Sequence, residues 1–317
     1  MKLAAAYKDV KLMAPDDAAV SFFKSPFAAH DTGSAIDIAY GDFGSPASSP
    51  VDGTVVDIRE FETPTPFKER DFKDYLTAVR CGDLIVRIMH VKPFVNVGDR
   101  MRTGEDFGTF IRSGYFYFWN SSHLHVEVRM PDEYLRARSN MPLDIPVGVV
   151  RQAFLGGADA DSGILDFTGE VVFLSKRYAL IDCPDYSTDG YLNGYSAGGF
   201  LLDGFIPTRE HALHRFGLVG KTRNAPPFDC FRSIGNSFMV YSSGVKLRVF
   251  DGQNRALDVA GASFILFFGK PLIKLVPIRY GESLPECGDL VSIQINACSG
   301  RQKINAREIK SLLDYTH

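Results

Sequence analysis

The sequence has no marked excess of charge of either sign. Its 317 residues include 35 lysines and arginines against 38 aspartates and glutamates, which gives a formal net charge of −3. Proteins that bind nucleic acid or an anionic membrane surface through their overall field usually carry a basic excess. The balance of charge therefore argues against both kinds of partner, and we expect no nucleic acid.

Long apolar runs are also missing. A membrane-spanning helix needs about 18 or more consecutive apolar residues, and the apolar stretch 260–269 is much shorter. Near the N-terminus, Lys8 and Asp9 interrupt the apolar run before it reaches the length of a signal-peptide core. We expect no membrane span and, as the sequence stands, a cytoplasmic protein.

Cysteine is scarce and has no metal-binding pattern. The five cysteines are an odd number, are widely spaced and contain no Cys-x-x-Cys pair. This spacing argues against a thiolate zinc site and favours buried, reduced thiols. The residues are Cys81, Cys183, Cys230, Cys287 and Cys298.

The most informative stretch present is Ser121-Ser-His-Leu-His-Val-Glu-Val128. Polar and apolar residues alternate in it, which is the pattern of a β-strand with one polar and one apolar face. His123 and His125 would then point to the same side, one strand repeat apart. An exposed polar strand face is the alternative, so other residues must join the two histidines to make a site.

A second candidate group precedes this strand. Asp37 lies between Ile36 and Ile38 in a short predicted strand, where a buried carboxylate requires a charged partner or a cation. His30 lies across a turn that contains Gly33.

Further along, Asp52-Gly53 before a β-branched run predicts a hairpin, and residues 72–76 are read as the site of a short helix. Residues 75–80 and 84–90 predict two strands of a hairpin that ends at His90. Short strands with Gly-Asp turns follow at 95–99 and 101–108. This alternation of short strands and turns is typical of compact β-sheets and barrel-like domains.

The order of these motifs resembles the lysostaphin/LytM-type zinc metallopeptidases, over about residues 25–148. The resemblance is carried by His30 with Asp37-Ile-Ala, by Pro50-Val-Asp-Gly-Thr-Val-Val56, by His90 with Val95-Asn-Val-Gly-Asp99, and by the Ser-His-Leu-His-Val-Glu-Val block. It implies a mainly β domain of the duplicated hybrid motif type, with a compact antiparallel sheet.

The resemblance also implies roles for individual residues. His30, Asp37 and His125 would hold zinc, and His90 and His123 would be catalytic. Six residues separate His30 from Asp37, where the family commonly has three, so Asp31 is a competing ligand. Two imidazoles and one carboxylate leave a fourth tetrahedral position for water, as catalytic zinc requires. The implied activity is hydrolysis of a peptide bond, and the implied substrate is a peptide or a peptidoglycan-like cross-link.

The chain is long enough for two domains, and we expect a metallopeptidase-like domain over 1–148 and an appended β-rich domain over 149–317. Strands are predicted at 169–175, 178–182, 238–241, 245–250 and 263–268, and an amphipathic helix at 304–313. His211 and His214 share one face of a predicted helix, where a solvated face is favoured over a second metal site.

Two other functions remain open from the sequence. A non-enzymatic relative of the fold could bind or activate a partner. A phosphocarrier-like domain could use a histidine as phosphate acceptor, although this would leave Asp37 unexplained.

Overall fold

The structure is a computed structural model, and it divides into two compact units. One unit consists of Met1–Phe22 and Phe27–Pro146, and the other of Phe23–Pro26 and Val147–His317. The fold is mainly β, as expected from the sequence. The residues that the structure describes are 1–23, 28–63, 72–136, 141–148, 150–152, 164–197, 199–208, 216–220, 231–234, 238–241 and 245–297.

The first unit contains a short helix and twelve described strands. The helix is α1 (Ala28–Asp31). The strands are β1 (Lys2–Tyr7), β2 (Val10–Ala14), β3 (Ala19–Ser21), β4 (Ala35–Ala39), β5 (Pro46–Ser48), β6 (Gly53–Glu62), β7 (Lys73–Cys81), β8 (Leu84–Met89), β9 (Val91–Pro93), β10 (Arg100–Met101), β11 (Asp106–Phe110) and β12 (Leu124–Arg129).

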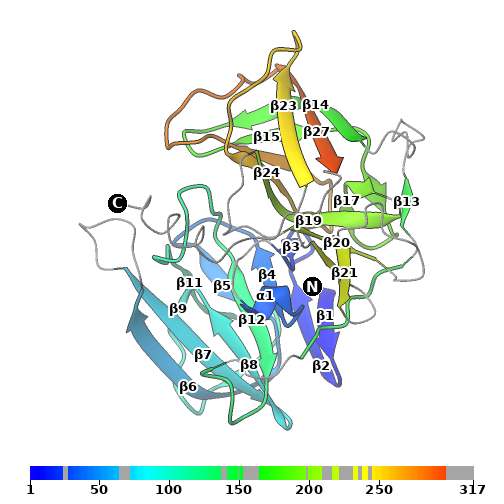
Figure 1. Ribbon diagram of the computed structural model, residues 1–317. Coiled ribbons are helices and arrows are strands. Elements are labelled where there is room, and N and C mark those ends of the chain that lie inside the picture. Colours follow the sequence, from blue (N-terminus) through cyan, green and yellow to red (C-terminus); the bar gives the residue numbers. More distant parts are fainter. Residues whose placement is uncertain are drawn as a thin grey trace, which may run out of the picture. The chain divides into compact units, whose positions relative to one another are not determined.

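Seven of these strands form the main sheet of this unit in the order β10-β6-β7-β8-β12-β4-β3, with antiparallel neighbours. Figure 1 shows β12 between β4 and β8. A smaller sheet has the order β5-β11-β9, and β1 pairs with β2. The strand that carries His125, and that His123 directly precedes, is therefore a central strand.

The alternation of residues in β12 has the expected consequence. Leu124, Val126 and Val128 are at most 1% exposed and form part of the core. The opposite face of the strand is polar but is also buried, which is unusual for charged side chains. Its residues are His125, Glu127 and Arg129.

Two local predictions in this unit are wrong. The segment 72–76 is not helical, because β7 begins at Lys73 and pairs with both β6 and β8. Asp52-Gly53 does not join two paired strands either, since β5 pairs with β11 and the start of β6 pairs with β10. In both cases long-range strand pairing overrides a local signal. The predicted hairpin at 75–80 and 84–90 is confirmed as β7 and β8, joined at Gly82.

The second unit contains the remaining strands. They are β13 (Arg151–Gln152), β14 (Ile164–Leu174), β15 (Ala179–Asp182), β16 (Ser187–Thr188), β17 (Asn193–Gly194), β18 (Ser196–Ala197), β19 (Phe200–Pro207), β20 (Phe216–Val219), β21 (Phe231–Ile234), β22 (Phe238–Tyr241), β23 (Val245–Asp251), β24 (Gly261–Phe264), β25 (Leu266–Phe267), β26 (Ile273–Val276) and β27 (Leu290–Ala297).

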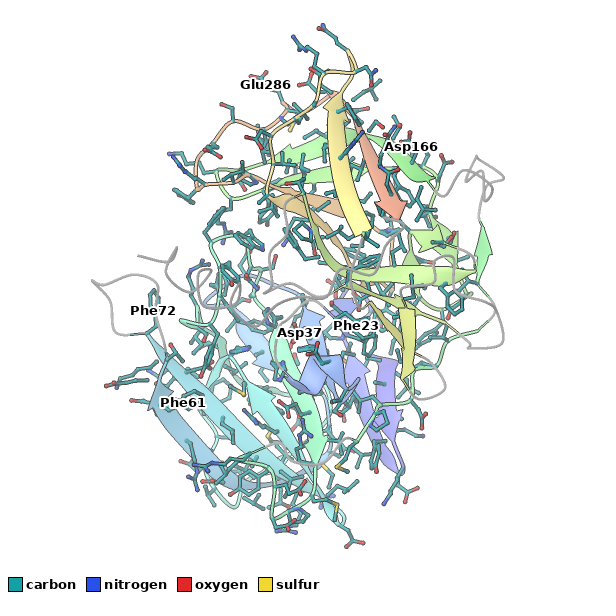
Figure 2. All side chains as sticks on the ribbon, in the orientation of Figure 1. Phe23, Asp37, Phe61, Phe72, Asp166 and Glu286 are labelled. Atoms are coloured by element: carbon teal, nitrogen blue, oxygen red, sulfur yellow. The ribbon has the colours of Figure 1, made fainter. Side chains whose placement is uncertain are left out.

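Antiparallel pairing in this unit runs along β21-β22-β20-β19-β24-β26-β15-β14-β27-β23. Its core includes Phe167, Ile181, Phe264 and Ile293. Figure 2 shows the side chains of both units, with Asp166 and Glu286 exposed on the second and Asp37 inside the first.

Four of the strands predicted in the second half are present as β14, β15, β22 and β23, and the segment 263–268 is divided between β24 and β25. The predicted helix at 304–313 and the pair His211 and His214 lie outside the described residues. Of the described cysteines, Cys183 is buried as expected, whereas Cys287 is exposed. In the part of the chain that the structure describes, no helix is long and apolar enough to cross a membrane.

Candidate metal centre

Three elements bring together the residues predicted to bind zinc. His30 lies on α1, Asp37 on β4 and His125 on β12. Asp37 and His125 are register partners in the antiparallel β4–β12 pair, so their side chains leave the sheet on the same face. Between α1 and β4 the chain turns at Gly33, whose φ of 65° suits glycine. This turn accommodates the six residues between His30 and Asp37.

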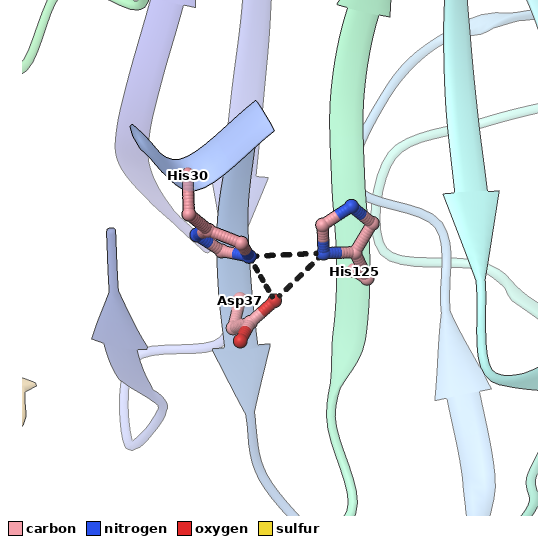
Figure 3. Close-up of side chains that lie close together, drawn as sticks. All are labelled: His30, Asp37 and His125. Atoms are coloured by element: carbon pink, nitrogen blue, oxygen red, sulfur yellow. Dashed lines mark hydrogen bonds and ion pairs between the residues drawn. The ribbon is translucent and has the colours of Figure 1, made fainter. Parts of the chain in front are cut away.

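The three ligand atoms form a small triangle (Figure 3). His30 Nε2 lies 3.1 Å from His125 Nδ1 and 3.3 Å from Asp37 Oδ1. His125 Nδ1 lies 3.0 Å from Asp37 Oδ1. Ligand atoms at about 2.0–2.1 Å from a tetrahedral zinc ion are about 3.3–3.4 Å from one another. The triangle therefore needs to expand by only a few tenths of an ångström to accept zinc.

Each histidine has a hydrogen-bond acceptor behind it. His30 Nδ1 lies 2.6 Å from the carbonyl oxygen of Phe22, and His125 Nε2 lies 2.8 Å from Glu127 Oε1. Both acceptors favour a proton on the outer ring nitrogen, so the inner nitrogen is the one that binds a metal once it is deprotonated. The outer partners thus select the tautomers that a metal site requires.

Glu127 lies behind the triangle, and the sequence reasoning did not assign it to the site. It is 3% exposed, and Arg129 Nε donates a hydrogen bond of 2.6 Å to its Oε2. Arg87 Nη1 lies 3.7 Å from its Oε1. Burial alone would raise the pKa of Glu127, but His125 and the two arginines hold it well below its usual value. Its position two residues after His125 on the same strand face was the available signal.

Without a metal, His125 is an imidazolium between two carboxylates. Burial opposes its charge, but hydrogen bonds to Asp37 and Glu127, and their charges, raise the pKa of His125 to about 9. Burial likewise favours the neutral form of Asp37, yet His30, His123 and His125 hold its pKa well below the usual range. One proton on His125 Nδ1 therefore occupies the triangle, in the place that a cation would take.

The two histidines predicted to be catalytic lie beside this triangle. His123 Nε2 is 3.7 Å from Asp37 Oδ2, and His123 Nδ1 is 2.9 Å from the carbonyl oxygen of Ser121. The ring centroid of His90 lies 5.2 Å from that of His123 and 5.9 Å from that of His125. All five predicted residues are thus brought together. Among the described residues, Asp31 does not belong to the group of ligand atoms that lie within 4.8 Å of one another.

Phe116 packs against both of these histidines. It is 4% exposed, stacks on His123 with ring centroids 4.6 Å apart, and meets His90 edge-on at 4.7 Å. Of the aromatic run that precedes the His-Leu-His strand, Tyr117 and Trp119 stack on each other, with ring centroids 4.6 Å apart. Phe116 therefore fixes one side of the site by packing.

Asp74 is a second residue that the sequence reasoning missed. Its Oδ2 lies 2.7 Å from His90 Nδ1. The sequence reasoning placed Asp74 in a predicted helix at 72–76 and so did not relate it to His90. Only the β7–β8 pairing brings the two residues close together.

Comparisons with known proteins give few matches. The model of the N-terminal domain of a family described as a domain of unknown function (DUF8155) matches residues 10–145. No curated protein matches this chain. Among solved structures, the chain is similar to the antimicrobial peptidase lysostaphin from Staphylococcus simulans, with 12% identity, a TM-score of 0.25, and coverage of 85% of this chain and 95% of that one. The solution NMR structure of lysostaphin gives 13% identity, a TM-score of 0.24, and coverage of 77% and 94%.

Proposed function

We propose that this chain is a zinc-dependent hydrolase, a metalloendopeptidase in which His30, Asp37 and His125 hold the metal. The observation that carries the proposal is the triangle of three ligand atoms, 3.0–3.3 Å apart, with a hydrogen-bond acceptor on the outer ring nitrogen of each imidazole. Closed structural zinc sites usually have four protein ligands and favour cysteine. Three ligands without cysteine suit a catalytic site.

Zinc in such a site supplies Lewis-acid activation of a carbonyl oxygen and of water at neutral pH. The protein supplies the remaining chemistry through His90 and His123. Both rings lie next to the ligand triangle, and each has Nδ1 bonded to an oxygen acceptor. His90 Nε2 is therefore positioned to take a proton from water or to donate one to the leaving amine, and His123 presents its Nε2 to the triangle, 3.7 Å from Asp37 Oδ2.

The proposed substrate class is a peptide, with peptidoglycan-like cross-links as the expectation that follows from the sequence resemblance. A phosphocarrier would need an acceptor histidine but no carboxylate between two imidazoles. The position of Asp37 in the triangle therefore favours the hydrolase. A non-enzymatic relative would have no need of His90 and His123 beside an intact ligand set.

Metal analysis tests the proposal directly. Purified wild-type chain supplied with zinc should contain about one zinc per chain by mass spectrometry, and the double variant His30→Ala/His125→Ala should contain none. His211→Ala/His214→Ala is the matched control, because it also removes two histidines and should retain the metal. Peptides with glycine-containing links and digests of peptidoglycan are then screened for cleavage.

A wild-type chain that takes up no zinc would contradict the proposal and favour the non-enzymatic alternative. A zinc-loaded chain that cleaves none of these substrates would retain the metal site and refute the peptidase assignment.

A further inference from the structure

Asp74 is a fully buried carboxylate with four hydrogen-bond donors. Its Oδ1 accepts from the backbone N–H of Tyr75 at 2.7 Å and from that of His90 at 3.0 Å. Its Oδ2 accepts from His90 Nδ1 at 2.7 Å and from Ser113 Oγ at 2.8 Å. A buried charge is tolerated only when it is paired and hydrogen-bonded, and Asp74 meets both conditions.

Two of these four bonds go to the same residue. Asp74 binds both the ring and the backbone N–H of His90, which lies directly after β8 with a φ of 72°. A non-glycine residue in this left-handed region is strained, and such residues concentrate at functional sites. The carboxylate therefore fixes the backbone and the side chain of His90 together.

The contact determines which ring nitrogen of His90 can do chemistry. Because Nδ1 donates its hydrogen to Asp74, Nε2 is the nitrogen left for proton transfer. Among the described residues, His90 Nε2 makes no hydrogen bond. His123 differs, because its Nδ1 is bonded to the neutral carbonyl of Ser121 rather than to a carboxylate.

Asp74 is suited to act as an ionised partner. Burial favours its neutral form, but the adjacent His90 and the hydrogen bonds from His90, Ser113 and Tyr75 lower the pKa of Asp74 below its usual value. An ionised carboxylate on Nδ1–H stabilises the positive charge that appears on an imidazole when Nε2 takes up a proton.

We propose that Asp74 is a positioning residue for catalysis, which holds His90 in the Nδ1–H tautomer and leaves Nε2 as its proton-transferring atom. The inference rests on the proposed hydrolase function. In that reaction the O–H bond of water breaks as its oxygen bonds to the carbonyl carbon, and a histidine Nε2 receives the proton. The C–N bond then breaks, and the nitrogen leaves as an amine with a proton from Nε2.

The tautomer can be measured by NMR without zinc and without a substrate. The full chain is labelled with ¹⁵N-histidine, and long-range proton–nitrogen spectra report which nitrogen of each ring carries the hydrogen. His90→Gln assigns the His90 signals. The wild type should show the Nδ1–H form at pH values where His90 is neutral. Asp74→Asn should shift His90 toward the Nε2–H form, because the amide can donate a hydrogen to Nδ1.

Ser113→Ala is the matched control, since it removes one donor to the same carboxylate and should leave the His90 tautomer unchanged. With a peptide that the wild type cleaves, Asp74→Asn should lower kcat by about 10²-fold or more, with little change in KM and in zinc content.

Several outcomes would overturn the inference. They are a wild-type His90 in the Nε2–H form, an Asp74→Asn variant that keeps the Nδ1–H form, or a loss of activity explained by zinc loss. The wild-type spectrum is decisive even if Asp74→Asn fails to fold. A chain that binds no zinc would refute the proposed function through metal analysis, independently of this measurement.

Discussion

Asp37 and His125 are direct partners across the β4–β12 pair, with Asp37 Oδ1 3.0 Å from His125 Nδ1. They are 88 residues apart in the sequence. One antiparallel pairing therefore creates two of the three proposed zinc ligands, and α1 adds His30. The same relationship separates the role of His125, on β12, from that of His123, which directly precedes the strand.

Replacement of these two histidines should have different effects. His125→Ala removes a ligand atom from the triangle and should abolish zinc binding, as measured by metal analysis. His123→Ala leaves the triangle complete and should retain about one zinc per chain while turnover falls by about 10²-fold or more. Equal loss of metal in both variants would contradict the assigned roles.

Removal of the charge of Glu127 should weaken both metal binding and folding. Glu127→Gln leaves Arg129 buried beside a neutral amide, and should lower the free energy of unfolding by about 3–5 kcal/mol in urea titrations. Because Glu127 supports His125, zinc affinity should fall by about 10–100-fold.

Glu105→Gln is the control for this variant, because Glu105 is exposed and forms a surface ion pair with Arg102 at 3.6 Å. It should cost less than about 1 kcal/mol. Similar effects of the two substitutions would show that the buried cluster does not support the site.

Zinc binding should release a proton at neutral pH. His125 has a pKa of about 9 in the metal-free protein, above its usual 6.5, so it carries a proton that zinc must displace from Nδ1. The apparent affinity should rise about tenfold per pH unit and level off above about pH 9. Calorimetry in buffers of different ionisation enthalpy should give about one proton released per zinc at pH 7, and a value near zero would contradict this account.

The same pKa has a consequence for the stability of the metal-free protein. Because the folded pKa is raised, the stabilisation is fully present below the unfolded value of about 6.5 and is lost as the pH rises through about 9. Thermal unfolding of the metal-free chain should show this decline. A His125→Gln variant should not show this component, and a wild type that melts at the same temperature throughout this range would disprove the prediction.

Removal of the Phe116 ring should destabilise the wall of the site. Phe116→Ala deletes a buried ring that contacts His90 and His123, and should lower the free energy of unfolding by about 3–5 kcal/mol. Phe94→Ala is the matched control, because Phe94 is 61% exposed and should change stability by less than about 0.5 kcal/mol. Equal costs in urea titrations would argue against tight packing of Phe116.

Local alternation in the sequence was sufficient to predict β12 and the hairpin of β7 and β8. In β12 apolar residues recur at every second position, and in β7 and β8 two strand-forming runs flank a Cys-Gly-Asp turn. Such patterns depend only on neighbouring residues. The same reasoning failed at 72–76 and at Asp52-Gly53, where the observed structure depends on pairing with distant strands. Local signals describe a segment but do not specify its partner.

The sequence by itself determined that the chain is mainly β and that His123 and His125 lie near each other, at the start of one strand. The resemblance of the motif order to that of a zinc metallopeptidase family supplied His30, Asp37 and His90 as candidates. Only the tertiary structure decided that Asp37 faces His125, that Glu127 holds His125 from behind, and that Asp74 holds His90. These contacts join residues 2–88 positions apart, and the orientation of each side chain follows from strand register and burial, which no short stretch of sequence contains.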